Sequence, residues 1–185
     1  TEVLLAGIEL FGLEECVSKL VGMFAFTLFD KQTQKTTLVR DRIGEKPLYY
    51  GYQNDQLLFA SELKAFEVHS KFEKKINAKA AVGFLLRSCV PQTFTIYEDI
   101  YKVGPGKILE FTVEDIKNGL KPKEITYWSL KEIVSKSKNS YIGNYEQATV
   151  ELEKILIRSV QNQSISDVPL GAFLSGGIDS SLVCA

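Results

Sequence analysis

The stretch that decides the fold of the first half of the chain is MFAFTLFDKQTQKTTLVR, residues 23–40. Residues 23–29 are strongly apolar and rich in aromatic residues, residues 35–40 are rich in β-branched residues, and the polar sequence DKQTQ at residues 30–34 separates the two segments. Runs of this composition on either side of a short polar turn are typical of paired β-strands. We therefore expect antiparallel strands at residues 23–29 and 35–40.

The segments on both sides of this hairpin extend the pattern. Apolar residues recur at spacings of three and four through residues 1–20, which predicts a helix interrupted near Gly12. Downstream, Asn54-Asp55 separates apolar runs at residues 48–53 and 57–61, which predicts a second hairpin. Helices combined with antiparallel hairpins indicate the α+β class.

The rest of the first half carries weaker signals. Asn77 is a suitable N-cap for a helix over residues 78–87, with Ala81, Phe84 and Leu85 on one face. Residues 107–112 and 125–128 are expected to be extended. A polar, lysine-rich stretch separates these two segments.

The composition changes at residues 135–143, which are dominated by Ser, Lys, Asn and Gly. Beyond them, Asn144 and Gln147 form the pattern of a capping box for a helix that ends near Gln163. We predict two domains, residues 1–134 and 144–185, joined by a linker at residues 135–143.

The bulk properties exclude several classes of protein. With 185 residues, 45% of them hydrophobic, and a formal charge of −1, the chain has the composition of a globular protein. No basic stripe points to nucleic acid, and no apolar run reaches the roughly 18 residues that a membrane span needs. His69 is the single histidine, which argues against a histidine-based triad or a multi-histidine metal site.

The three cysteines have no metal-ligand spacing. They are Cys16, Cys89 and Cys184. We expect them to be buried thiols of a cytoplasmic protein.

The Arg40-Asp41-Arg42 cluster follows the first hairpin. We interpret it as a charged turn between the hairpins with a structural or interdomain rather than a catalytic role, because ion pairs often stabilise such turns.

The segment with the clearest chemistry is SGGIDSS, from Ser175 to Ser181, which follows LGAFL, an expected buried strand at residues 170–174. Gly176 and Gly177 allow the backbone to turn sharply and to approach a ligand closely. A helix that starts near Ser180 would offer free N–H groups to phosphate. Ser175, Ser180 and Ser181 would add hydroxyl donors, and Asp179 could hold Mg²⁺ shared with phosphate.

Three other interpretations of SGGIDSS compete with a phosphate site. A Walker loop needs a Gly-Lys-Ser/Thr ending, and the segment has no lysine. A serine hydrolase elbow needs glycine two residues before the serine, where Phe173 stands. An ordinary serine-glycine turn between a strand and a helix remains a third interpretation.

Several motifs in sequence order resemble the glutamine-dependent asparagine synthetase family. DVPLGAFLSGGIDSS resembles its PP-loop, while GMFAFTLFD, RDRIGEKPLYYG and ASELKAF resemble its late glutaminase domain. The stretch from TIYEDIYKVGPGKILEF to YWSL resembles the segment that connects the two domains.

The resemblance implies the C-terminal part of an N-terminal-nucleophile glutaminase domain with two stacked antiparallel sheets, followed by the first helix and strand of an α/β PP-loop ATP pyrophosphatase domain. It implies glutamine, aspartate and ATP as substrates, Mg²⁺ as cofactor, and asparagine formed through β-aspartyl-AMP. It is compatible with a homodimer. The residues it assigns to ATP and pyrophosphate are Phe173, Leu174, Ser175, Gly176, Gly177, Asp179, Ser180 and Ser181, with Phe173 and Leu174 beside the adenosine and Asp179 on Mg²⁺.

The same resemblance places the catalytic cysteine upstream of Thr1, so we expect an internal fragment that has no catalytic residue and is inactive by itself. Thr1 is not expected to replace that nucleophile, because TEVLL reads as a helix. Two alternatives stay open. One is a related amidotransferase that acts on another carboxylate, such as a sugar acid, a peptide or a β-lactam precursor. The other is a nucleotide-binding relative without turnover.

Overall fold

The computed structural model describes residues 1–92, 94–138, 140 and 143–185. It divides into two compact units, Thr1–Val134 and Ser135–Ala185. Helix α6 (Leu130–Ser137) includes the start of the predicted linker, residues 135–137. Residues 139, 141 and 142 of that linker lie outside the described residues.

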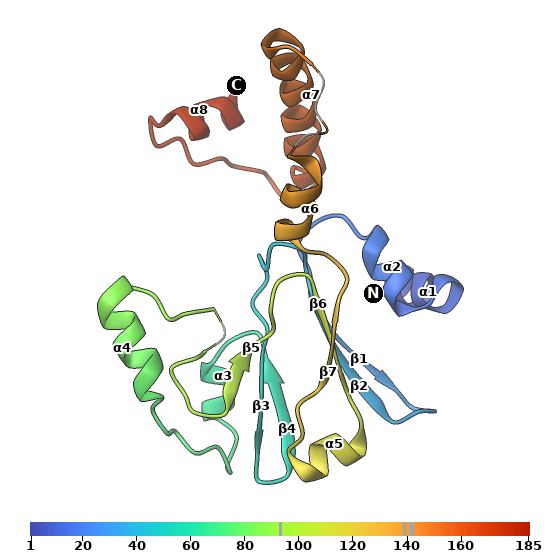
Figure 1. The fold of residues 1–185 in the computed structure, drawn as a ribbon, viewed down its shortest axis with the longest axis vertical. Helices are drawn as coiled ribbons and strands as arrows, with labels where there is room; N and C mark the ends of the chain where they lie inside the picture. Colours follow the sequence, from blue (N-terminus) through green and yellow to red (C-terminus); the bar gives the residue numbers. More distant parts are fainter. Residues whose placement is uncertain (93, 139, 141–142) are drawn as a thin grey trace. The chain divides into compact units, whose positions relative to one another are not determined.

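Two antiparallel sheets form the first unit (Figure 1). The four-stranded sheet has the order β1-β2-β6-β7 and consists of β1 (Ala25–Asp30), β2 (Lys35–Arg40), β6 (Lys107–Phe111) and β7 (Lys123–Thr126). The three-stranded sheet has the order β4-β3-β5 and consists of β4 (Gln56–Ala60), β3 (Tyr49–Gln53) and β5 (Ile100–Lys102). The β1–β2 and β3–β4 pairs confirm both predicted hairpins.

The central strands of the four-stranded sheet, β2 and β6, have buried residues on both faces. Neighbouring residues of a strand point to opposite sides of the sheet, so each face carries its own apolar cluster. On one face, Leu38 packs with Leu109 and Phe111 and with two residues that flank strands of the other sheet, Leu48 and Val103. On the opposite face, three residues pack together: Val39 of β2, Ile108 of β6 and Val17 of α2 (Leu13–Lys19). Consecutive residues of β2 therefore contribute to two separate apolar clusters.

Two helical segments of the first unit occur where the sequence predicted them. The predicted N-terminal helix is divided into α1 (Glu2–Phe11) and α2 at Gly12, whose φ is 78°. Helix α4 (Ala78–Arg87) begins after Asn77, whose side chain accepts from the backbone N–H groups of Lys79 and Ala80. The short helix α3 (Lys64–Glu67) lies between β4 and α4 in the sequence.

Three features of the first unit differ from expectation. Helix α5 (Val113–Asn118) occupies the stretch read as merely polar, because Thr112 and Asp115 form a capping box there. Strand β7 begins two residues before the predicted extended segment at residue 125. Of the three cysteines expected to be buried, only Cys16 is; Cys89 is exposed, and so is Cys184 of the second unit.

The second unit contains α7 (Tyr145–Gln163) and α8 (Ile178–Cys184). The capping box predicted for α7 is present in both directions, at 2.9 Å and 3.0 Å between Asn144 and Gln147. The strand expected at residues 170–174 is wrong: this segment has no ladder partner among the described residues, and a strand needs one to satisfy its backbone groups. In the described part of the chain, no helix has the length and apolar character to cross a membrane.

Candidate functional site

The predicted phosphate loop is closed by two serines. The backbone N–H of Ser175 donates to Ser180 Oγ at 3.3 Å, and the two hydroxyl oxygens lie 2.9 Å apart. The loop therefore returns on itself after five residues. No spacing rule in the sequence predicted this contact.

The hydroxyls at the start of α8 point into the loop. Ser180 Oγ donates to the carbonyl of Gly177 at 3.1 Å, and Ser181 Oγ donates to the same carbonyl at 2.9 Å. These bonds tie Gly177, the N-cap residue, to the first turn. The hydroxyls of Ser180 and Ser181 would therefore have to rotate before they could donate to a phosphate oxygen.

The two glycines have different roles. Gly176 has a φ of 78°, in the left-handed region that favours glycine, and no atom of the described residues beyond its two chain neighbours lies within 4 Å of the place a Cβ would take. Gly177 has a φ of −79°, which any residue adopts, and its Cβ would make only ordinary contacts with Ser175 and Ser180. The backbone conformation thus requires glycine at position 176, while at position 177 only a ligand would require it.

The remaining predicted site residues lie on either side of the glycines. Helix α8 begins at Ile178, two residues before the expected start, so Asp179 lies in its first turn. Phe173 is 100% exposed and Leu174 is also exposed, so neither packs against the described chain. Among the described residues, no side chain caps the N-terminus of α8. All eight predicted residues therefore lie in one continuous segment that presents backbone donors and a carboxylate to solvent.

A second polar cluster surrounds Asp41, which is only 2% exposed. Its carboxylate accepts backbone N–H groups from Ile43, Gly44 and Glu45 on Oδ1, at 2.7–3.2 Å, and from Lys46 and Phe24 on Oδ2, at 3.0 Å and 3.4 Å. Burial raises the pKa of this carboxyl, but the backbone donors favour the ionised form more strongly, so the pKa is lowered overall. The carboxylate holds the whole turn after β2.

Arg40 completes this cluster. Its guanidinium donates to three backbone carbonyls: those of Lys46 at 2.7 Å, Val103 at 2.6 Å and Gly44 at 2.6 Å. The Val103 contact joins the end of β2 to the residue that follows β5. These bonds confirm a structural role for the Arg40-Asp41 turn, although the sequence did not show how many backbone groups it holds.

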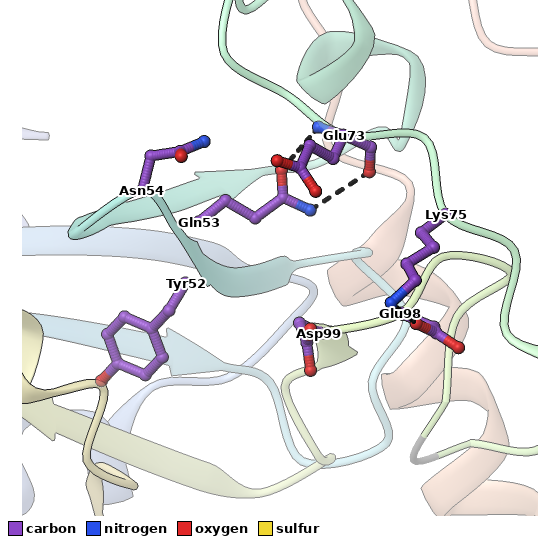
Figure 2. Close-up of a pocket in the computed structure, with 7 residues that line it drawn as sticks. All are labelled: Tyr52, Gln53, Asn54, Glu73, Lys75, Glu98 and Asp99. Carbon is purple, nitrogen blue, oxygen red and sulfur yellow. Dashed lines mark hydrogen bonds and ion pairs between the residues drawn. The ribbon is translucent and has the colours of Figure 1, made fainter.

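Figure 2 shows a polar pocket of about 230 Å³ between the β3–β4 turn and the loops around Glu73 and Glu98. Gln53 forms two hydrogen bonds with the backbone of Glu73, at 2.8 Å and 3.3 Å, and Lys75 pairs with Glu98 at 3.0 Å. These contacts occupy Gln53, Lys75 and Glu98, while Tyr52, Asn54, Glu73 and Asp99 supply the other polar side chains of the lining. Over the described residues, no group of three or more His, Cys, Asp or Glu side chains could hold a metal ion.

Two protein families match the chain in succession. The glutamine amidotransferase domain family matches residues 1–128, and the asparagine synthase family matches residues 151–185. The first match covers the two-sheet unit, and the second covers most of α7 and the whole glycine-serine loop.

Curated relatives match nearly the whole chain. Asparagine synthetase [glutamine-hydrolyzing] 1 of Bacillus subtilis is 35% identical, over 99% of this chain and 27% of its own length. Asparagine synthetase [glutamine-hydrolyzing] 2 of the same organism is 32% identical, over 90% and 22%. An amidase of Gibberella zeae is 30% identical, over 98% and 25%.

The chain spans about a third or less of the length of these relatives. Within that span, both family matches occur in the order that the sequence motifs predicted. The chain belongs to the glutamine-dependent asparagine synthetase family, with a glutamine amidotransferase domain followed by asparagine synthase residues.

Proposed function

We propose that the protein containing this chain converts aspartate to asparagine, with ATP to activate the side-chain carboxylate and glutamine as the source of ammonia. The observation that carries the proposal is the order of the two family matches, with the SGGIDSS loop inside the second. A relative named as a glutamine-hydrolysing asparagine synthetase is 35% identical across the same span.

In this proposal, residues 175–181 bind the phosphates of ATP. Gly176 lets the backbone turn towards the ligand, and the uncapped N–H groups at the start of α8 would donate to phosphate oxygens. The Ser175–Ser180 contact holds the loop closed before the nucleotide arrives. Phe173 and Leu174, which are exposed, would provide apolar surface for the adenosine.

Asp179 fits the role of a Mg²⁺ ligand, because its carboxylate lies in the first turn of α8, beside the phosphate donors. When bound, Mg²⁺ would supply positive charge against the charge that develops on departing pyrophosphate. The loop residues position the phosphates, and Asp179 positions the cation.

The test is Asp179→Asn in the full-length protein, because this change removes the charge and keeps the shape. We expect asparagine formation from aspartate, glutamine and ATP to fall by about a hundredfold or more. Ammonia release from glutamine should stay within about threefold of wild type, because that reaction belongs to the other domain.

Glu153→Gln is the control, since Glu153 is an exposed carboxylate of α7 in the same unit and lies outside the DVPLGAFLSGGIDSS motif. Unchanged asparagine output from Asp179→Asn would contradict the role of this carboxylate. Equal loss in both variants would mean that the unit is simply sensitive to lost charge.

A second candidate function has support from the amidase relative, which is nearly as similar to the chain as the synthetases are. It is amide formation on a different carboxylate by the same ATP-dependent route. Pyrophosphate release measured with aspartate and with other carboxylic acids distinguishes the two, because only the true acceptor should stimulate it.

A further inference from the structure

A pocket of about 590 Å³ lies in the first unit, where β2 ends and β6 begins. Its lining combines charged and apolar side chains. Those that matter here are Arg42, Ile43, Pro105, Lys107, Trp128 and Glu132. Ligand sites typically have this size and join a few polar groups to apolar walls.

Arg42 is the cation with unused donors. Its Nη2 donates to the carbonyl of Ser18 at 2.7 Å, which holds the guanidinium from one side. Its Nε is buried and has no hydrogen-bond partner among the described residues. In the same part of the chain, Arg42 forms no salt bridge. The guanidinium is permanently charged and also lines the pocket, where a carboxylate would neutralise its charge.

The other cation of the pocket is already neutralised. Lys107 Nζ contacts Glu124 Oε1 at 2.6 Å and Thr126 Oγ1 at 2.6 Å. Glu132 adds a negative charge to the lining. With Lys107 paired, Arg42 is the cation left to an anionic ligand, and a single carboxylate matches its charge, whereas a phosphate dianion exceeds it.

The pocket is held in shape by backbone contacts. Gly106 donates its N–H to the carbonyl of Asp41 at 2.9 Å and accepts the N–H of Trp128 at 3.4 Å. A Cβ at Gly106 would lie 2.2 Å from the carbonyl oxygen of Trp128, so glycine is needed for this approach. The Asp41 turn therefore fixes the positions of both Arg42 and Trp128, which reduces the entropy lost when a ligand binds.

We propose that this pocket binds a small monocarboxylate with an apolar or aromatic body, with the carboxylate on Arg42 and the body against Trp128 and Pro105. The proposal does not depend on the phosphate loop. It assigns a ligand site to the amidotransferase part of the chain that is separate from the nucleotide site.

Trp128 is the single tryptophan of the chain, so its fluorescence reports on this pocket directly. Phenylacetate serves as the probe, with phenylacetamide as its neutral counterpart and phenyl phosphate as a dianion of similar body. We expect saturable quenching by phenylacetate below about 10 mM, and binding at least about tenfold weaker for the other two.

Two variants test the residues without removing the fluorophore. Arg42→Gln should weaken phenylacetate binding by about tenfold or more, while Arg87→Gln, in the last turn of α4, should leave it unchanged. Arg42→Gln also removes the hydrogen bond to the Ser18 carbonyl, so a second pair of variants changes an exposed residue of the lining instead. Ile43 is 69% exposed, and Ile43→Asp should weaken binding by about tenfold, whereas Ile43→Asn should change it by less than about threefold.

Quenching of equal strength by phenylacetamide, or tighter binding of phenyl phosphate, would overturn the carboxylate assignment. Equal affinities for the Ile43→Asp and Ile43→Asn variants would also overturn it. Absence of saturable quenching in the folded wild-type chain would remove the site altogether.

Discussion

The two units of the chain obtain their structure in different ways. The buried residues of the described chain lie within Thr1–Val134, where two sheets and α2 enclose the apolar clusters around Leu38 and Val39. None of the described residues of Ser135–Ala185 is buried. Helices α7 and α8 form there from local signals, while residues 170–174 remain unpaired. The helix and loop geometry at the phosphate site is therefore encoded locally, whereas the strand before it depends on neighbouring strands.

The largest effect should come from the core of the first unit. Phe111 is fully buried, so Phe111→Ala should lower the free energy of unfolding by about 3–5 kcal/mol, because it removes apolar contacts and leaves a cavity. Phe173 is fully exposed, and Phe173→Ala should leave that free energy unchanged. Urea denaturation followed by Trp128 fluorescence measures both. A loss of stability in Phe173→Ala would contradict this difference between the units, since it would mean that the Phe173 side chain packs against the protein.

The buried carboxylate should give the next largest effect. Asp41→Ala leaves several part-buried backbone N–H groups without their acceptor, and the free energy of unfolding should fall by about 2–3 kcal/mol. Asp30 also accepts backbone N–H groups, from Gln32 and Thr33, but in an exposed turn. Asp30→Ala should therefore lower the free energy of unfolding by clearly less in the same denaturation experiment.

The pH dependence gives an independent check on Asp41. Its pKa in the folded chain is lowered, so its contribution is present above the unfolded value of about 3.9 and is lost as the pH falls through the folded value. The stability difference between wild type and Asp41→Ala should therefore shrink below about pH 4. A difference that stays constant to lower pH would mean that the charge of Asp41 does not matter.

The smallest effect compares one type of cap in the two units. Asn77 caps α4 and Asn144 caps α7 through the same side-chain chemistry. Asn77→Ala should lower the unfolding free energy of the first unit by about 1 kcal/mol. Asn144→Ala should leave that value unchanged and instead speed the hydrogen exchange of amides in α7. Equal effects of the two variants on unfolding would show that the units unfold together.

The sequence predicted the elements that depend on local signals. The Asn54-Asp55 turn and the caps at Asn77 and Asn144 act over two to four residues, and the structure has them as predicted. Helix α5 also had a local signal, the Thr112–Asp115 pair, which was overlooked because the lysine-rich surroundings looked unstructured.

The features that the sequence did not predict depend on contacts between residues far apart in the chain or on the exact path of the backbone. The Asp41 turn was recognised as structural, but its hydrogen bonds require the backbone path of residues 42–46 and the position of Phe24. The Arg42 pocket brings residues 42, 105 and 128 together only after the sheet has formed. At the phosphate site, the motif predicted the eight residues. The Ser175–Ser180 contact and the start of α8 at Ile178 depend on how the backbone turns at Gly176, which the motif does not specify.

Two glycine variants of the full-length protein test whether residues 175–181 hold the phosphates of ATP. Gly176 has a positive φ and lies in the loop, while Gly171 has no such constraint and, among the described residues beyond its two chain neighbours, no atom within 4 Å of its Cβ position. We predict that Gly176→Ala lowers aspartate-dependent pyrophosphate release from ATP by about a hundredfold or more, and that Gly171→Ala stays within about threefold of wild type. Wild-type pyrophosphate release from Gly176→Ala would contradict the account.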